Sequence, residues 1–263
     1  MENNGILIPL LLSAFAGLST AIGSAIAFIA GSRGGRFLSF GLGLSAGVMV
    51  YVSFMEIMPH SAEKAGEWGA FLFFFAGIGI AALIDRLIPE AQNPHEARSI
   101  SDIKKLSTAG KIKKSGLMRT GVFTAFAITI HNFPEGFATF AMAASDIELG
   151  ITIAIAVAIH NIPEGISVSV PIYAATNDRG RAFWYSAVSG LAEPAGALIG
   201  WLILAPFMSD MVFGGVMGAV AGIMIYISFD ELLPTAREYG EGHTEIAGVI
   251  SGMAVMGLSL NLL

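Results

Sequence analysis

The stretches TIHNFPEG (residues 129–136) and AIHNIPEG (residues 158–165) repeat one polar motif, and both copies lie in strongly apolar surroundings. Each copy places a histidine, an asparagine and a glutamate where unpaired polar groups are costly. The histidine lies four residues before the glutamate and the asparagine three before it, so on a helix these side chains share one face. The repeat therefore indicates a polar site inside an apolar helical protein.

Composition indicates that the solvent of this protein is a lipid bilayer. Of its 263 residues 54% are hydrophobic and only 13% are charged, which is typical of an integral membrane protein. Windows of about 19 residues, long enough to span the hydrocarbon core, predict an all-α fold of eight transmembrane helices. The predicted spans are 6–30, 36–59, 68–88, 118–144, 149–174, 182–206, 211–234 and 245–263.

The distribution of charge predicts the orientation of these helices. Of the 14 Lys and Arg residues, all except Lys64 would lie on one side of the membrane. An excess of positive charge marks the cytoplasmic side, so both termini are expected outside. The basic stretch 89–117 is predicted to be a flexible cytoplasmic loop, in which His95, Glu90 and Glu96 offer at most a weak metal site. The first span is too long for a cleaved signal peptide.

A second internal repeat links two distant spans. AGVMVYVSFMEIMP (46–59) and AGIMIYISFDELLP (221–234) are identical at eight of fourteen positions. The predicted spans that carry them cross the membrane in opposite directions, as do the two spans with the HNxPEG motifs. Inverted repeats related by a pseudo-two-fold axis are typical of transporters, with the substrate site near mid-membrane. A duplication without a transport role is the alternative.

The fourth and fifth spans should form a helical hairpin with a tight turn centred between Ile147 and Glu148. His131 would then lie level with Glu164, and Glu135 level with His160, at about mid-bilayer depth. The motif prolines, Pro134 and Pro163, are expected to kink these helices and to leave the carbonyl oxygens of Ile130 and Ile159 without their usual partner. Gly136 and Gly165 would let neighbouring helices come close.

Another carboxylate, Glu193, lies in the middle of the sixth span, yet the deep parts of all spans lack Lys and Arg. Clustered carboxylates in a low dielectric repel one another and favour protonation. A divalent cation bound by carboxylate, imidazole and amide oxygen would satisfy them without a basic side chain. The absence of cysteine excludes thiolate ligands, disulfides and haem attachment.

Other interpretations of the buried polar groups remain open. Protonated glutamates that only hydrogen-bond between helices account for one or two carboxylates but not for a duplicated constellation. A proton relay is physically reasonable because intramembrane acids serve pumps. A membrane metal-dependent hydrolase is the rival from another class, although HNxPEG differs from the zinc-protease pattern H-E-x-x-H and no nucleophile stands out.

The chain combines two HNxPEG motifs, eight predicted spans, a loop between the third and fourth spans and an EP pair in the sixth. In this combination it resembles the ZIP (Zrt/Irt-like protein) family of divalent metal transporters, especially its bacterial members. The resemblance implies a binuclear site with bridging glutamates. The first metal would be held by His131, Glu135, His160, Glu164 and Glu193. The second metal would be held by Asn132, Glu135, Asn161, Glu164 and Glu193.

The resemblance also suggests roles outside this core. Met49 would approach the first metal, with ordinary packing as the alternative, whereas its repeat partner Met224 is expected in the core. Asp230 and Glu231 match positions implicated in metal release, or are solvated helix-end acids. At the predicted outer mouth, Glu56, His60 and Glu63 either concentrate cations or lie on a solvated loop.

The expected function is uptake of divalent metal into the cytoplasm by a single transmembrane domain, residues 1–263, in the inner membrane of a prokaryote. Zinc is the expected substrate, and iron(II), manganese, cobalt and cadmium stay open because His160 departs from the family pattern at its position. The expected protein is not an enzyme and needs no catalytic cofactor. Its partners are metal ions and the lipid bilayer, with no nucleic acid. Small-residue faces such as GLGLSAG (41–47) permit a homodimer.

Overall fold

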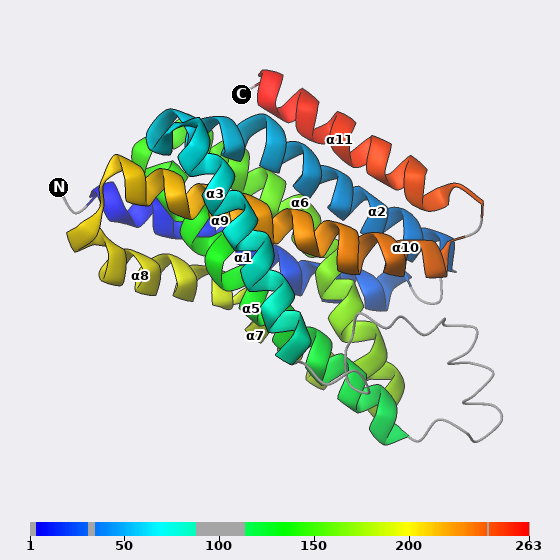
Figure 1. The fold of residues 1–263 in the computed structure, drawn as a ribbon. Helices are drawn as coiled ribbons and strands as arrows, with labels where there is room; N and C mark the ends of the chain where they lie inside the picture. Colours follow the sequence, from blue (N-terminus) through cyan, green and yellow to red (C-terminus); the bar gives the residue numbers. More distant parts are fainter. Residues whose placement is uncertain (1–3, 31–34, 88–113, 241, 263) are drawn as a thin grey trace.

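The protein is a bundle of α-helices (Figure 1). The computed structural model describes residues 4–30, 35–87, 114–240 and 242–262, and these contain no β-strand. The elements are α1 (Asn4–Ala30), α2 (Gly35–Val52), η1 (Ser53–Ile57), α3 (Met58–Leu87), α5 (Lys114–Ser145), α6 (Ile147–Thr176), α7 (Arg179–Gly190), α8 (Ala192–Leu204), η3 (Ala205–Phe207), α9 (Asp210–Ile227), η4 (Ser228–Leu232), α10 (Leu233–Tyr239) and α11 (Thr244–Leu262).

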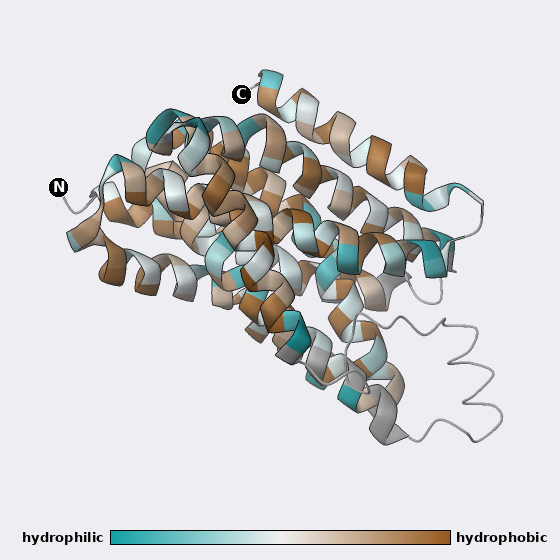
Figure 2. Ribbon diagram, in the orientation of Figure 1, coloured by the Kyte–Doolittle hydropathy of each residue, from teal (hydrophilic) through white to brown (hydrophobic). Residues whose placement is uncertain are grey.

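Within the described residues, six helical stretches are long and apolar enough to cross a membrane. They are Gly5–Phe28, Arg36–Arg86, Ile147–Thr176, Arg179–Phe207, Asp210–Tyr239 and Thr244–Leu262. Hydrophobic residues occur all along the outward-facing helices (Figure 2), and many large apolar side chains are exposed there. Such a surface suits lipid rather than water. The all-helical integral membrane fold expected from composition is therefore confirmed.

The helix boundaries differ from the predicted ones at several places. The second and third predicted spans form one helical run, α2–η1–α3, whose backbone leaves helical geometry at Gly66 with φ 76° and ψ 160°. The expected outer loop after Pro59 is thus wrong, because the residues before Gly66 are helical. The sixth predicted span is interrupted at Leu191, between α7 and α8. α5 already begins at Lys114, and the rest of the predicted loop, with His95, lies outside the described residues.

Each copy of the second repeat contains a widened π-helical turn at the same place. In η1 the N–H of Met58 donates to the carbonyl of Ser53, and in η4 the N–H of Leu233 donates to the carbonyl of Ser228. A proline lies two residues after the end of each of these turns, at residues 59 and 234. Because proline lacks an N–H, the regular pattern must be interrupted here, and a single π-turn accommodates the interruption without ending the helix.

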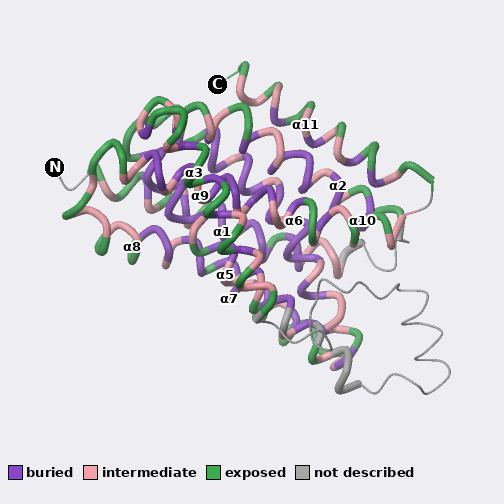
Figure 3. Tube along the Cα trace, viewed as in Figure 1, coloured by how far each residue is buried: buried purple, intermediate pink, exposed green. Residues whose placement is uncertain are grey.

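The helices pack in two groups. In the first group α3 lies along α9 and α2 along α11. In the second group α6 packs against α1 and α5, and α7 and α8 complete the group. The groups meet where α2 contacts α6 and α9 contacts α5. Figure 3 shows that α6 is buried along much of its length, which places it at the centre of the bundle.

Glycines set the close approach of helices in the first group. A β-carbon built on Gly47 would overlap the carbonyl oxygen of Val249 in α11, and one on Gly222 would overlap that of Phe74 in α3. Gly47 and Gly222 hold the same position in the second repeat. The interval along the chain from Phe74 to Val249 equals the interval from Gly47 to Gly222. The helix pairs α2–α11 and α9–α3 therefore use equivalent residues for equivalent contacts. Small residues of this kind are how membrane helices approach closely.

Gly77 and Gly79 provide a matched test of this packing on a single helix. A β-carbon at Gly77 would overlap the carbonyl oxygen of Ala219, whereas nothing lies within 4 Å of one at Gly79. We expect Gly77→Ala to destabilise the protein by about 1–3 kcal/mol through overpacking, seen as a lower unfolding temperature in detergent. Gly79→Ala should leave that temperature unchanged or slightly raised. Equal effects of the two substitutions would contradict the proposed role of close helix contact.

Candidate metal centre

The two HNxPEG motifs meet across the α5–α6 hairpin. His131 Nε2 lies 3.3 Å from Glu135 Oε1 and 3.4 Å from Glu164 Oε1. His160 Nε2 lies 3.3 Å from Glu135 Oε2. The prediction that His131 lies at the same depth as Glu164, and Glu135 at the same depth as His160, is thus confirmed. The turn itself is at Asp146, slightly earlier in the chain than expected.

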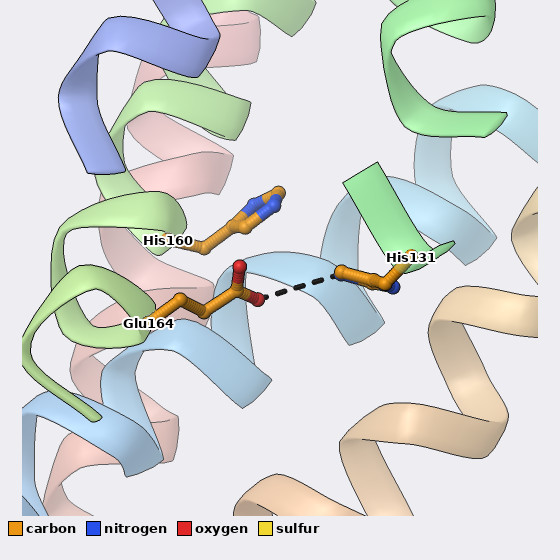
Figure 4. Close-up of side chains that lie close together, drawn as sticks. All are labelled: His131, His160 and Glu164. Atoms are coloured by element: carbon orange, nitrogen blue, oxygen red, sulfur yellow. Dashed lines mark ion pairs between the residues drawn. The ribbon is translucent and has the colours of Figure 1, made fainter. Parts of the chain in front are cut away.

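Three of these side chains form a cluster whose ligand atoms are close enough together to hold a metal ion. His131, His160 and Glu164 each offer one ligand atom, and these atoms all lie within 4.8 Å of one another. All three residues are buried. Figure 4 shows His160 and Glu164 projecting from α6 toward His131 on α5. Two imidazoles and a carboxylate are a ligand set that zinc accepts readily.

Glu193 is fully buried in the first turn of α8, directly after the interruption at Leu191. Pro194 follows it and occupies the first helical turn, where a missing N–H costs little. The Glu193 carboxylate accepts a hydrogen bond from the Asn161 amide through Oε1. This contact connects the sixth predicted span to the α6 motif, as the sequence led us to expect.

Backbone carbonyls fix the two motif asparagines. Asn161 Nδ2 donates to the carbonyl oxygen of Ala16 in α1 at 3.0 Å, and Asn132 Nδ2 donates to that of Ser189 in α7 at 3.3 Å. Each amide nitrogen is thus used by a backbone carbonyl, whereas each amide oxygen has no hydrogen-bond donor among the described residues. These carbonyl partners were not predicted, since a backbone acceptor has no sequence signature.

Several buried oxygens at this centre have no hydrogen-bond donor in the described structure. They are Asn132 Oδ1, Asn161 Oδ1, Glu164 Oε2 and Glu193 Oε2. The chain has no Lys or Arg between residues 120 and 178, which excludes a basic partner from α6 and from most of α5. Unsatisfied buried acceptors are costly. A divalent cation would satisfy them, so the donor set fits a metal-binding role.

A small cavity adjoins Glu135 and is otherwise mostly apolar. Its lining includes Val52, Ile57 and Met224, and Ser53 Oγ lies 3.7 Å from Met224 Sδ. Met224 lies in the buried core, as expected, and it also lines this cavity. Met49 is fully buried in the apolar core, and its role as a ligand stays a prediction.

Two further residues that the sequence did not single out support the centre. The Ser45 hydroxyl of α2 donates to the backbone carbonyl of His160 at 3.2 Å. Thr20 of α1 is fully buried, and its backbone carbonyl lies against Gly165 of the second motif. Serine and threonine on apolar helices gave no pattern that distinguishes these roles from ordinary packing.

The acidic residues predicted for metal release and those predicted for the outer mouth differ in their contacts. In η4, Glu231 is partly buried, whereas Asp230 is exposed. Glu56 in η1 instead lies beside His60, with Oε1 3.5 Å from Nδ1. Glu63 is exposed on the helical segment of α3 that precedes Gly66.

Comparison with known proteins gives a consistent result. A family model described as ZIP zinc transporter matches residues 4–260. A zinc transporter ZupT of Clostridium perfringens is 52% identical over 98% of this chain and 97% of its own length. Proteins of the same name from Streptococcus mutans and Chlorobium phaeovibrioides are 53% and 56% identical, over 96% and 97% of both chains.

Removal of one carboxylate should weaken metal binding measurably. We expect Glu164→Gln to lower the affinity of the detergent-solubilised protein for Zn²⁺ by at least about tenfold, because even outer-shell partners of metal ligands contribute that much. Titration calorimetry measures the affinity directly. Glu148→Gln is the control, since Glu148 is an exposed acid at the start of the same helix. Unchanged affinity in Glu164→Gln would exclude this carboxylate as a ligand.

Proposed function

Because the chain belongs to the ZIP family of zinc transporters, we propose that it moves Zn²⁺ from outside the cell into the cytoplasm through the centre between α5, α6 and α8. The observation that carries this proposal is the set of buried carboxylate and amide oxygens that lack a hydrogen-bond donor, on helices whose deep parts carry no Lys or Arg. A resident positive side chain would neutralise such a site permanently. A site that lacks one is suited to an ion that arrives and leaves.

We propose further that the centre holds two metal ions. His131, Glu135, His160, Glu164 and Glu193 bind the first ion, and Asn132, Asn161 and the same three glutamates bind the second. The oxygens Asn132 Oδ1 and Asn161 Oδ1 support the second position, since their amide nitrogens are already used by backbone carbonyls. Carboxylates have two oxygens each and so can bridge neighbouring cations.

Eight membrane crossings and inverted repeats are the architecture we propose around this centre. The long stretch Arg36–Arg86 contributes two crossings, because Gly66 divides it. α5 runs antiparallel to α6 and contributes another. The π-turns η1 and η4 lie at equivalent positions of the repeat, and the glycine contacts of α2–α11 and α9–α3 are equivalent too. These correspondences support a pseudo-two-fold relation between the halves.

The orientation that we propose has both termini outside and the basic 89–117 stretch in the cytoplasm. The near-complete segregation of Lys and Arg supports it, and the start of α1 and the end of α11 lie on the same side of the bundle, away from the α10–α11 connection (Figure 1). Residues 1–263 then form one transporter domain in the cytoplasmic membrane of a bacterium. A homodimer stays a prediction.

The rival functions differ in how well they fit. The family consists of transporters, so the metal-dependent hydrolase is not favoured. Iron(II), manganese, cobalt and cadmium are further proposed substrates, since imidazole and carboxylate ligands accept all of them. Protons compete with metal for the same imidazoles and carboxylates, so proton movement would accompany metal transport rather than replace it.

Zinc flux into sealed vesicles tests the function. We expect purified protein in proteoliposomes to accumulate radiolabelled Zn²⁺, and Glu135→Ala or Glu164→Ala to abolish the uptake, because each substitution removes a ligand of both proposed ions. Glu148→Ala should retain uptake. Size-exclusion profiles establish whether each variant is folded. Full uptake by the Glu135→Ala/Glu164→Ala double variant would rule out this centre as the transport site.

A further inference from the structure

A third internal repeat relates α1 to the helices α7 and α8. SAFAGLSTAIGSA (13–25) and SAVSGLAEPAGAL (186–198) are identical at five of thirteen positions. Gly17 and Gly190 hold the same position in this repeat, and the carbonyl oxygen of each lies 2.2 Å from a β-carbon built on the other. α1 and α7 therefore cross at equivalent residues.

The contacts of this repeat with the motif helices are equivalent as well. A β-carbon on Gly165 would overlap the carbonyl oxygen of Thr20, and one on Gly136 would overlap that of Glu193. Each of these glycines ends an HNxPEG motif, and Thr20 and Glu193 hold the same position in the third repeat. Thr20 thus occupies on α1 the place that Glu193 occupies on α8.

The hydrogen bonds of the motif asparagines follow the same correspondence. Asn161 Nδ2 donates to the carbonyl oxygen of Ala16, and Asn132 Nδ2 donates to that of Ser189. Ala16 and Ser189 again hold the same position in the third repeat. The glycine contacts and these hydrogen bonds are separate observations, and both support the equivalence of Thr20 and Glu193.

Only one proposed ligand of the two ions has a different residue as its counterpart. Glu193 is matched by Thr20. Asn161 donates to the Glu193 carboxylate, so the equivalent contact would involve Asn132 and Thr20. The other proposed ligands form identical pairs, which are His131 with His160, Asn132 with Asn161, and Glu135 with Glu164.

The hydroxyl of Thr20 is fully buried and has no hydrogen-bond partner among the described residues. A helical threonine often donates to the carbonyl oxygen four residues earlier, as Thr129, Thr152 and Thr176 do here. For Thr20 that oxygen belongs to Ala16, and it already accepts from Asn161 Nδ2 at 3.0 Å and from Ser19 Oγ at 2.6 Å. The Thr20 hydroxyl is therefore left for a group outside its own helix.

The Thr20 side chain lies next to the segment that holds Asn132. A β-carbon built on Gly190 would lie 3.0 Å from Thr20 Cβ. The residue before Gly190 is Ser189, whose carbonyl oxygen accepts from Asn132. Asn132 Oδ1 is buried and has no donor among the described residues either. Two polar groups without a partner thus adjoin the same end of α7.

The difference in length between the two equivalent side chains corresponds to one water molecule. The hydroxyl of threonine ends two bonds short of the carboxylate of glutamate. A water at the usual hydrogen-bond distance of about 2.8 Å from the hydroxyl spans that difference. A neutral hydroxyl with a water also costs less to bury than another carboxylate beside Glu135, Glu164 and Glu193.

Taking the proposed function as its basis, we propose that Thr20 is a positioning residue of the metal centre. Its hydroxyl accepts a hydrogen bond from a water that binds the second zinc ion beside Asn132. Glu193 supplies a carboxylate at the equivalent place beside Asn161. Hydrogen-bond partners of metal ligands fix the orientation of those ligands and raise the affinity for the metal.

Zinc affinity tests this role. We expect Thr20→Val, which keeps the side-chain shape and removes the hydroxyl, to lower the Zn²⁺ affinity of the detergent-solubilised protein about tenfold in titration calorimetry. Thr20→Ser keeps the hydroxyl and should keep most of the affinity. Ser24→Ala is the matched control and should bind zinc like the wild type. Ser24 also carries a buried hydroxyl without a described partner, one turn further along α1, but its counterpart in the third repeat is Ala197.

The stability of the metal-free protein separates this role from a structural one. Because the Thr20 hydroxyl has no partner in the described protein, Thr20→Val should leave the unfolding temperature without zinc unchanged or slightly raised. Unchanged zinc affinity in Thr20→Val would overturn the proposal. A loss of affinity that Thr20→Ser does not restore, or that Ser24→Ala shares, would overturn it too. A wild-type protein that binds no zinc in the same titration refutes the proposed function instead.

A crystal structure of the wild-type protein with zinc gives a second measurement that needs no variant. We expect a water ligand of a zinc ion within about 3 Å of Thr20 Oγ1, on the side of Asn132. A Thr20 hydroxyl that donates to a protein carbonyl, with no water beside it, would contradict the proposal even if zinc is bound at the centre.

Discussion

The cost of placing carboxylates in an apolar interior without a Lys or Arg partner governs this structure. Glu135, Glu164 and Glu193 are all buried, and the helices around them offer imidazoles, amides and backbone carbonyls rather than ammonium or guanidinium groups. Such groups can share a cation but cannot replace one. The α5–α6 hairpin brings the histidines and carboxylates together, and α1 and α7 hold the asparagines by backbone contacts that do not consume an amide oxygen.

The parts of this centre that the sequence predicted are those that depend on periodicity and a short turn. The level of His131 with Glu164 follows from an antiparallel hairpin, and the protein class follows from composition. The carbonyls of Ala16 and Ser189 could not be predicted, because any residue supplies a carbonyl oxygen. The continuous helix across residues 58–65 could not be predicted either, since polar residues near a membrane surface suit a helix as well as a loop.

Some prolines of this protein lie near an interruption of their helix and others do not. α5 and α6 continue through Pro134 and Pro163, whereas the sixth predicted span is interrupted at Leu191, before Pro194, and π-turns precede residues 59 and 234. A proline in a packed helix can be absorbed by neighbours, and irregular backbone persists in a membrane protein where it borders a polar site. The interruption at Leu191 lies two residues from Glu193, which is consistent with that rule.

The hydrogen bond between Ser45 and His160 joins the two groups of helices at the level of the proposed metal ligands. Apolar side chains such as Val52 and Met224 lie nearby, at the boundary between the groups. A hydrogen bond of this kind contributes about 1 kcal/mol, little more than thermal energy, and apolar contacts have no preferred direction. Among the hydrogen bonds described above, this one therefore offers little resistance to movement between the groups, and its loss would act on the backbone that carries an imidazole proposed to bind zinc.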